Sequence, residues 1–114
     1  MHELAVTESI LAITLNHAEK AAARRVTDIH LVIGQLSSIV DDSVQFYWDM
    51  ISENTLAQGA QLHFNRIPAR MKCLSCGQVF EMPGRLEPCP TCQSYTLQVT
   101  AGEEFYIESI EIET

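Results

Sequence analysis

The chain has 114 residues, of which 46% are hydrophobic, which is enough for one domain or for a small domain carrying a smaller module. Seven Lys and Arg residues stand against fifteen Asp and Glu residues, so the formal net charge is −8. This balance argues against nucleic acid as the main ligand, because phosphate backbones are bound by clustered basic side chains. No apolar run reaches the roughly 18 residues that cross a bilayer, and no secretory signal is recognised, so we expect a cytoplasmic protein.

The first predicted element is a helix over residues 4–23. Its apolar residues recur at helical spacing, no Gly or Pro interrupts it, and Glu3 at its start suits the helix dipole. The expected buried stripe consists of Leu4, Leu11, Leu15, Ala18 and Ala22.

A strand is predicted over residues 26–33, ending at Gly34. Its alternation places Ile29, Leu31 and Ile33 on a covered face and Asp28, His30 and Val32 on a wetter face. A second helix is predicted over residues 43–56, with Asp41 or Asp42 as its N-cap. Its expected core residues are Val44, Tyr47, Trp48 and Ile51.

Two further strands are predicted, over residues 61–67 and 105–113, on either side of a cysteine-containing segment at 70–100. The alternation of the last strand slips, and a bulge near Glu108 and Ser109 would restore one apolar face. We therefore expect an α+β fold in which two helices pack on a three-stranded sheet, with an inserted zinc-ribbon (small β) domain. The expected domains are 1–68 plus 102–114, and 69–101.

The strongest motif is a pair of CxxC sequences, Cys73 with Cys76 and Cys89 with Cys92, separated by twelve residues. Each CxxC places two thiolates on one ion, and two such turns complete a tetrahedron. Zinc is the predicted metal, and iron in a rubredoxin-like centre is the alternative, because four thiolates suit either. All four positions are filled by protein, so a structural site is expected.

The amino terminus, Met1-His2-Glu3, offers a second set of metal donors. The α-amine, the backbone nitrogens of His2 and Glu3 and the His2 imidazole lie within a few bonds of one another, and contiguous nitrogen donors of this kind select Ni(II) or Cu(II). The structural alternative is an exposed His2 beside a helix-dipole partner. The other histidines, His17, His30 and His63, show no comparable partners and are expected to be surface or half-buried residues.

No set of nucleophile, base and orienting residue is visible in the sequence, and neither GxSxG, HExxH nor a phosphate-binding glycine loop occurs. We therefore expect a protein that is not an enzyme.

The chain resembles the HypA/HybF family of nickel metallochaperones. The resemblance rests on the combination of Met1-His2-Glu3, the sequence RVTDIHLVIGQLSSI, the two cysteine pairs and a final strand, and it covers essentially the whole chain. It implies a nickel-binding αβ domain and a zinc-ribbon domain. It also implies that His2 and Glu3 carry Ni(II), and that the four cysteines, Cys73, Cys76, Cys89 and Cys92, bind structural Zn(II).

The same resemblance implies partners: the GTPase HypB and the large subunit of a [NiFe]-hydrogenase, with urease accessory proteins for some family members. The predicted function is delivery of Ni(II) during hydrogenase maturation. The alternative is a zinc-ribbon interaction or adaptor module without a role in nickel transfer.

Overall fold

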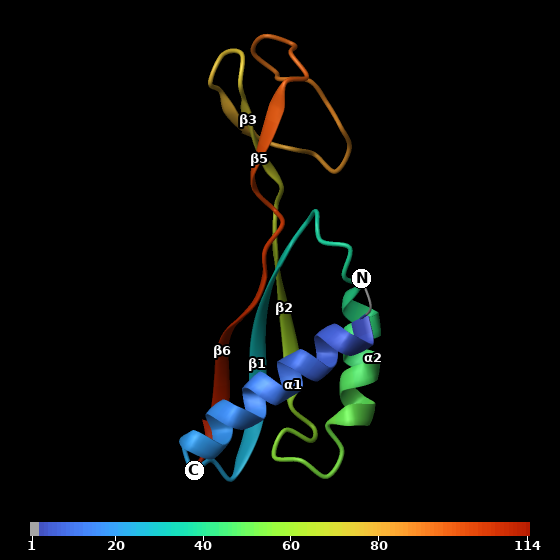
Figure 1. The fold of residues 1–114 in the computed structure, drawn as a ribbon, viewed down its shortest axis with the longest axis vertical. Helices are drawn as coiled ribbons and strands as arrows, with labels where there is room; N and C mark the ends of the chain where they lie inside the picture. Colours follow the sequence, from blue (N-terminus) through green and yellow to red (C-terminus); the bar gives the residue numbers. More distant parts are fainter. Residues whose placement is uncertain (1–2) are drawn as a thin grey trace. The chain divides into compact units, whose positions relative to one another are not determined.

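The computed structural model describes residues 3–114 (Figure 1). The elements in chain order are α1 (Glu3–Lys20), β1 (Arg25–Gly34), α2 (Asp41–Ile51), β2 (Gln61–Ile67), β3 (Arg70–Cys73), β4 (Val79–Glu81), β5 (Leu97–Ala101) and β6 (Phe105–Glu113). The strands form two three-stranded sheets, ordered β2-β1-β6 and β4-β3-β5. The predicted α+β fold, two helices with a three-stranded sheet and an inserted small β segment, is confirmed.

The chain divides into two compact units. The first comprises Met1–Leu31, Ser38–Asn65 and Tyr106–Thr114, and the second comprises Val32–Ser37 and Arg66–Phe105. The first unit holds both helices, and the second holds sheet β4-β3-β5 with all four cysteines. Across residues 3–114, neither helix is long and apolar enough to cross a membrane.

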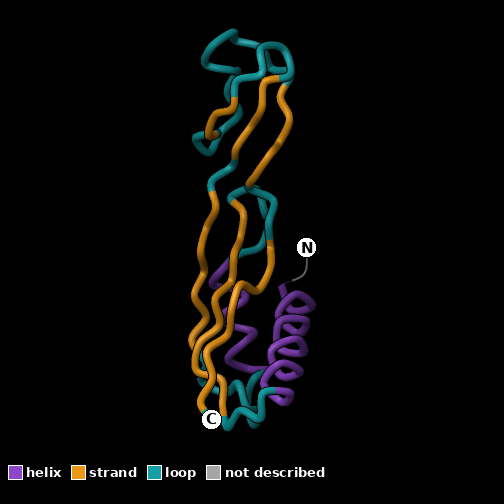
Figure 2. Tube along the Cα trace, turned by 90° about the vertical axis from the view of Figure 1, so that its left-hand side faces the viewer, coloured by secondary structure: helices purple, strands orange, loops and turns teal. Residues whose placement is uncertain are grey.

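The two helices pack against each other. Figure 1 shows α1 crossing one face of the β2-β1-β6 sheet, and Figure 2 shows it to one side of these strands. The predicted core face of β1 is confirmed, because Ile29, Leu31 and Ile33 have no exposed surface. On the other face Asp28 and His30 are half-buried, as predicted. Val32, which the alternation placed on the wetter face, is instead buried, because both faces of β1 are covered over its last four residues, Leu31 to Gly34.

The edge strand β6 behaves as its slipped alternation predicts. Phe105, Ile107, Ile110 and Ile112 are half-buried, whereas the consecutive residues Glu108 and Ser109 are both exposed. The half-buried apolar residues therefore continue along the strand on both sides of Glu108 and Ser109, where the alternation shifts by one residue.

The predicted buried stripe of α1 is only partly right. Ala18 is buried as predicted and Leu11 and Leu15 are half-buried, but Ala22 is exposed and Leu4 is 40% exposed. The buried residues of the helix are Thr7, Ile10, Thr14 and Ala18. Three of these four residues are small, so they allow the helix to approach its neighbours closely, and the Thr7 hydroxyl donates to the Glu3 carbonyl within the helix. A pattern that counts only apolar residues misses threonines of this kind.

The structure also ends α1 earlier than predicted, at Lys20 instead of residue 23. Ala22 has a φ of +54°, the Ala23 N–H donates to the Ala18 carbonyl and the Ala22 N–H donates to the Glu19 carbonyl. These two bonds form a Schellman motif, which closes the helix with a left-handed residue. Alanine, a strong helix former, occupies the position that glycine usually takes. The sequence therefore predicted a helix that continues past its actual end.

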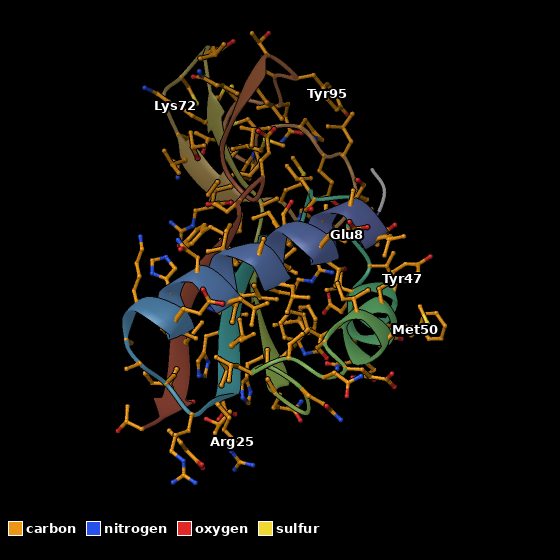
Figure 3. The ribbon with its side chains drawn as sticks, turned by 60° about the horizontal axis from the view of Figure 1, so that its bottom comes forward. Glu8, Arg25, Tyr47, Met50, Lys72 and Tyr95 are labelled. Atoms are coloured by element: carbon orange, nitrogen blue, oxygen red, sulfur yellow. The ribbon has the colours of Figure 1, made fainter. Side chains whose placement is uncertain are left out.

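The second helix is shorter than predicted, ending at Ile51 instead of 56, and its N-cap is Val40. Neither Asp41 nor Asp42 caps it; both lie in its first turn, where the helix dipole favours acidic groups. The predicted core is confirmed for Val44 and Trp48, which are fully buried, whereas Tyr47 and Ile51 are half-buried. Figure 3 shows Met50 projecting away from the opposite side of the same helix.

We predict that Ala22→Gly stabilises the protein by about 0.5–1 kcal/mol, because glycine adopts a positive φ without the clash that a Cβ causes. Thermal unfolding of the metal-loaded chain measures the effect. Ala12→Gly is the matched control, since Ala12 is exposed within α1 and its replacement costs about 1 kcal/mol. Destabilisation by both substitutions would contradict the prediction.

Candidate metal centre

The four cysteine sulfurs form one cluster in the second unit. They all lie within 4.8 Å of one another, and the Sγ atoms of Cys73 and Cys92 are 3.5 Å apart, those of Cys76 and Cys89 3.6 Å apart. All four are free cysteines. In a tetrahedral site with metal–sulfur bonds near 2.3 Å the sulfurs stand about 3.8 Å apart. The cluster therefore matches the size of one tetrahedrally bound ion.

The two CxxC turns share one backbone geometry. The Gly77 N–H donates to the Cys73 carbonyl and the Gln93 N–H donates to the Cys89 carbonyl, both at 2.8 Å. Gly77 and Gln93 also share a positive φ, of +81° and +63°. A glycine after the first CxxC marks this turn in the sequence, whereas the glutamine after the second gives no such signal.

Three strands hold the cysteine turns in place. β3 pairs with β4 and β5 in antiparallel fashion and ends at Cys73, whose N–H donates to the Gln78 carbonyl. The second turn closes on itself, because the Cys89 N–H donates to the Ser94 carbonyl. The apolar support is small, and it consists of Ala69, Met71 and Met82, with Phe80 and Leu97 packed against them.

The pKa values of the thiols are shifted in opposite directions. The Cys76 amide favours the thiolate of Cys73 and lowers its pKa to about 6. The Ser94 amide pulls the pKa of Cys92 down, but the adjacent Cys73 thiol, burial and the remaining thiols outweigh it and raise this pKa to about 12. Neighbouring thiols cannot all ionise at once without a cation, so the set of donors favours a bound dication.

This arrangement has a limited chemical repertoire. Four protein sulfurs fill a tetrahedral coordination sphere, which leaves no position for water or substrate. Cys73 and Cys89 are buried and Cys76 and Cys92 are exposed, so the cluster lies at the surface of its unit. A metal bound here would tie together two turns that are thirteen to nineteen residues apart in sequence.

The predicted terminal nickel ligands are only partly described. His2 lies outside the described residues, and Glu3 is the first residue of α1, where it is half-buried. Figures 1 and 2 both show α1 beginning beside α2. The assignment of His2 and Glu3 to Ni(II) remains a prediction.

Two histidines that the sequence left without partners are brought together by the sheet. The His30 and His63 rings stack with centroids 4.5 Å apart and planes 11° apart. The His63 Nε2 lies 2.7 Å from an Asp28 oxygen, and the His30 Nε2 lies 3.1 Å from a Glu111 oxygen. The prediction that these two histidines are surface or half-buried residues is confirmed, since His30 is half-buried and His63 is exposed. Their contact with each other was not predicted, because it depends on the pairing of the strands, which no local motif reveals.

Comparison with known proteins gives a match over nearly the whole chain. A family model described as "Hydrogenase/urease nickel incorporation, metallochaperone, hypA" matches residues 1–112. A protein from Dehalococcoides mccartyi strain CBDB1, named hydrogenase maturation factor HypA, is 46% identical over 113 residues, covering 99% of this chain and 95% of that protein. A protein of the same name from Caldanaerobacter subterraneus subsp. tengcongensis is 44% identical, covering 99% of this chain and all of that protein.

Solved structures agree with this match. The solution structure of the Ni metallochaperone HypA from Helicobacter pylori superposes with a TM-score of 0.66 at 26% identity, covering 99% of this chain and 98% of that chain. A second solution structure, of a HypA protein, gives a TM-score of 0.72 at 27% identity, covering 98% of this chain and 96% of that chain.

Proposed function

The chain belongs to the HypA family of hydrogenase and urease nickel-incorporation proteins, and from this premise we propose that it is a nickel metallochaperone that delivers Ni(II) to the large subunit of a [NiFe]-hydrogenase. The observation that carries the proposal is the match of the nickel-incorporation family over residues 1–112, which includes both predicted metal regions. In this role the chain binds and releases a metal ion and has no enzymatic activity of its own.

We assign the transported Ni(II) to His2 and Glu3. The support is chemical: an imidazole next to backbone nitrogens forms five- and six-membered chelate rings, and tetragonal nitrogen sites favour Ni(II) or Cu(II) over zinc. Glu3 begins α1, so the ligand set would sit at the N-terminal end of a helix. A site at the end of an element leaves room for a receiving protein to approach the metal.

We assign a structural Zn(II) to Cys73, Cys76, Cys89 and Cys92. The sulfur distances fit a tetrahedral ion of this size, and zinc has no redox chemistry that would compete with nickel transfer. On this assignment residues 69–101 form a zinc-ribbon domain, and residues 1–68 with 102–114 form the nickel-binding domain.

We further propose the partners that the family resemblance implies. These are the GTPase HypB and the hydrogenase large subunit, with urease accessory proteins as additional partners in organisms that use them. The place of action is the cytoplasm, where a reducing environment keeps four closely spaced thiols available for metal.

The competing function is a zinc-ribbon adaptor without a role in nickel transfer. The zinc ribbon alone supports it equally well, because paired CxxC turns occur in many interaction modules. Nickel binding distinguishes the two functions: an adaptor has no use for a nickel site at His2.

We predict that His2→Ala abolishes the high-affinity binding of one equivalent of Ni(II), because the His2 imidazole is the one side-chain nitrogen among the first residues of the sequence. Isothermal titration of the zinc-loaded protein with NiCl2 measures the loss. His17→Asn, which changes an exposed histidine in α1, is the control and should bind as the parent does. If His2→Ala binds the first equivalent with parental affinity, the proposed nickel site is wrong.

We also predict that the purified chain contains about one zinc ion and that replacing all four cysteines by serine abolishes it. The small core around Ala69 and Met71 is too limited to hold the ribbon without metal. Metal analysis gives the zinc content, and NMR spectra report which residues lose their dispersed signals. An ordered ribbon in the metal-free variant would refute the structural role of the zinc.

A third prediction concerns the outer face of α1, defined as Glu8, Glu19 and Lys20. These residues are exposed, and Glu8 lies on the face of the helix toward the viewer in Figure 3. If HypB docks on this face, Glu8→Lys combined with Glu19→Lys weakens the complex several-fold at low salt while nickel binding stays unchanged.

The matched control is Glu103→Lys, which reverses an exposed charge in the other unit. Binding to HypB is measured by interferometry at two ionic strengths. Equal affinity of the α1 double variant and the parent at low salt would exclude this face.

A further inference from the structure

The outer side of α2 exposes large apolar side chains to solvent. Phe46 is 61% exposed and Met50 is 50% exposed, and the N-cap residue Val40 is 52% exposed. Figure 3 shows Tyr47 and Met50 projecting from the outer side of this helix. A helix on the surface of a soluble protein usually presents polar residues on its outer side, so an apolar outer side indicates a surface that binds something.

Helical spacing separates this surface from the core of the first unit. Val44 and Trp48 are fully buried and hold the inner side of α2. Phe46 and Met50 are four residues apart, so they are neighbours on the opposite side of the helix. The exposed apolar side chains are therefore additional to those that the fold uses. We call this surface the α2 stripe, and it consists of Val40, Phe46, Tyr47 and Met50.

The two aromatic rings of the α2 stripe are held in a defined geometry. Phe46 and Tyr47 have ring centroids 5.5 Å apart and planes at 69°, which is an edge-to-face contact. Tyr47 is half-buried, so it restrains the exposed Phe46 ring from one side. A ring that is already restrained loses less conformational freedom on binding. Met50, with its flexible thioether, can adapt to the shape of a binding partner.

One flank of the α2 stripe is acidic. Asp42 lies four residues before Phe46 and Asp49 lies three residues after it, so both are neighbours of this ring on the helix surface. Both aspartates are exposed, and neither forms an ion pair within residues 3–114, although Asp49 accepts a hydrogen bond from Gln45 at 2.9 Å. Residues 41–51 contain no Lys, Arg or His, so negative charge lines this flank without compensation.

We propose that the α2 stripe docks a basic amphipathic helix of a partner protein. The apolar face of that helix covers Phe46 and Met50, and its Lys or Arg side chains face Asp42 and Asp49. The aspartates are seven residues apart, or about 10.5 Å along the helix axis, so basic residues at i and i+7 of the partner match them. The inference goes beyond the proposed function and does not depend on it.

The charges favour this occupant over a second copy of the chain. A copy that docked through its own α2 stripe would add acidic side chains and no basic one, which leaves the carboxylates of both copies without partners. The net charge of −8 also opposes self-association and contact with an anionic bilayer. A basic helix supplies both the apolar cover and the missing positive charge.

The test uses the full-length, zinc-loaded chain and two synthetic helical peptides of about 20 residues, a length at which isolated helices form. Both peptides carry leucines on one face; one has lysines on the flank at i and i+7, and the other has glutamates there. NMR of the methionine methyl groups follows the titration. We expect the lysine peptide to shift the Met50 signal and to leave Met71 and Met82, which are buried in the second unit, unchanged. Equal affinity for the two peptides would overturn the proposal.

Variants identify the surface through fluorescence anisotropy of the labelled peptides. Phe46→Ser should weaken binding of the lysine peptide about 10-fold or more, as loss of an aromatic anchor does. Leu86→Ser, which changes a residue that is 72% exposed in the other unit, is the matched control and should bind as the parent does. Parental affinity of the Phe46 variant would refute the docking surface.

A charge swap tests the acidic flank. Asp42→Lys combined with Asp49→Lys should weaken the lysine peptide about 2–30-fold at low salt and strengthen the glutamate peptide, a reversal that loss of folding cannot produce. An unchanged preference for the lysine peptide would refute the role of the aspartates. Sedimentation without peptide examines the second copy: a dimer formed by the parent and not by Phe46→Ser would overturn the proposal.

Discussion

The second unit depends on one electrostatic constraint: four thiols lie within 4.8 Å of one another. The Cys76 amide lowers the pKa of Cys73, whereas the Cys73 thiol, burial and the other thiols outweigh the Ser94 amide and raise the pKa of Cys92. Neighbouring sulfurs therefore cannot all carry charge without a compensating cation. The apolar cluster of the same unit is small, with Ala69, Met71 and Met82 as its buried residues. The three short strands bring the two CxxC turns together, and a metal ion bound by the four thiols would supply free energy that the small core lacks. On the proposed function this explains why a nickel carrier also contains a site that never releases its metal.

Close backbone packing is the second constraint, and it gives a structural role to residues 33–37, IGQLS, which are part of the sequence that resembles the HypA/HybF family. A Cβ on Gly34 would lie 2.0 Å from the Gly102 carbonyl oxygen, and a Cβ on Gly102 would lie 2.7 Å from the Ala69 Cα. The side-chain oxygen of Gln35 accepts a hydrogen bond from the Ala69 N–H, and its own N–H donates to the Ile67 carbonyl. These residues are held by backbone contacts within one unit, and none of them contributes a ligand to the four-cysteine cluster.

Sequence reasoning succeeded where the signal is local. The alternation of β1 predicted its buried face, the helical spacing around Trp48 predicted the core of α2, and the CxxC spacing predicted the thiol cluster. It failed where the structure depends on contacts between distant residues or on unusual backbone conformations. The small residues Thr7 and Thr14 took core positions in place of leucines, and the positive φ of Ala22 ended α1 early. The pairing of His30 with His63 depends on strand register, which neither strand encodes alone.

The proposed metal sites differ in how many coordination positions the protein fills. This difference decides whether a site keeps its metal ion or can pass it to another protein. Four sulfurs complete a tetrahedron, so an ion there has no open position through which a receiving ligand could attack. The proposed nickel site at His2 and Glu3 would leave positions for water, and a receiving protein could replace that water one ligand at a time. The net charge of −8 raises the local concentration of cations around an open site of this kind. On the proposed function, such a carrier would hold one metal to maintain its fold and exchange another at a site with open coordination positions.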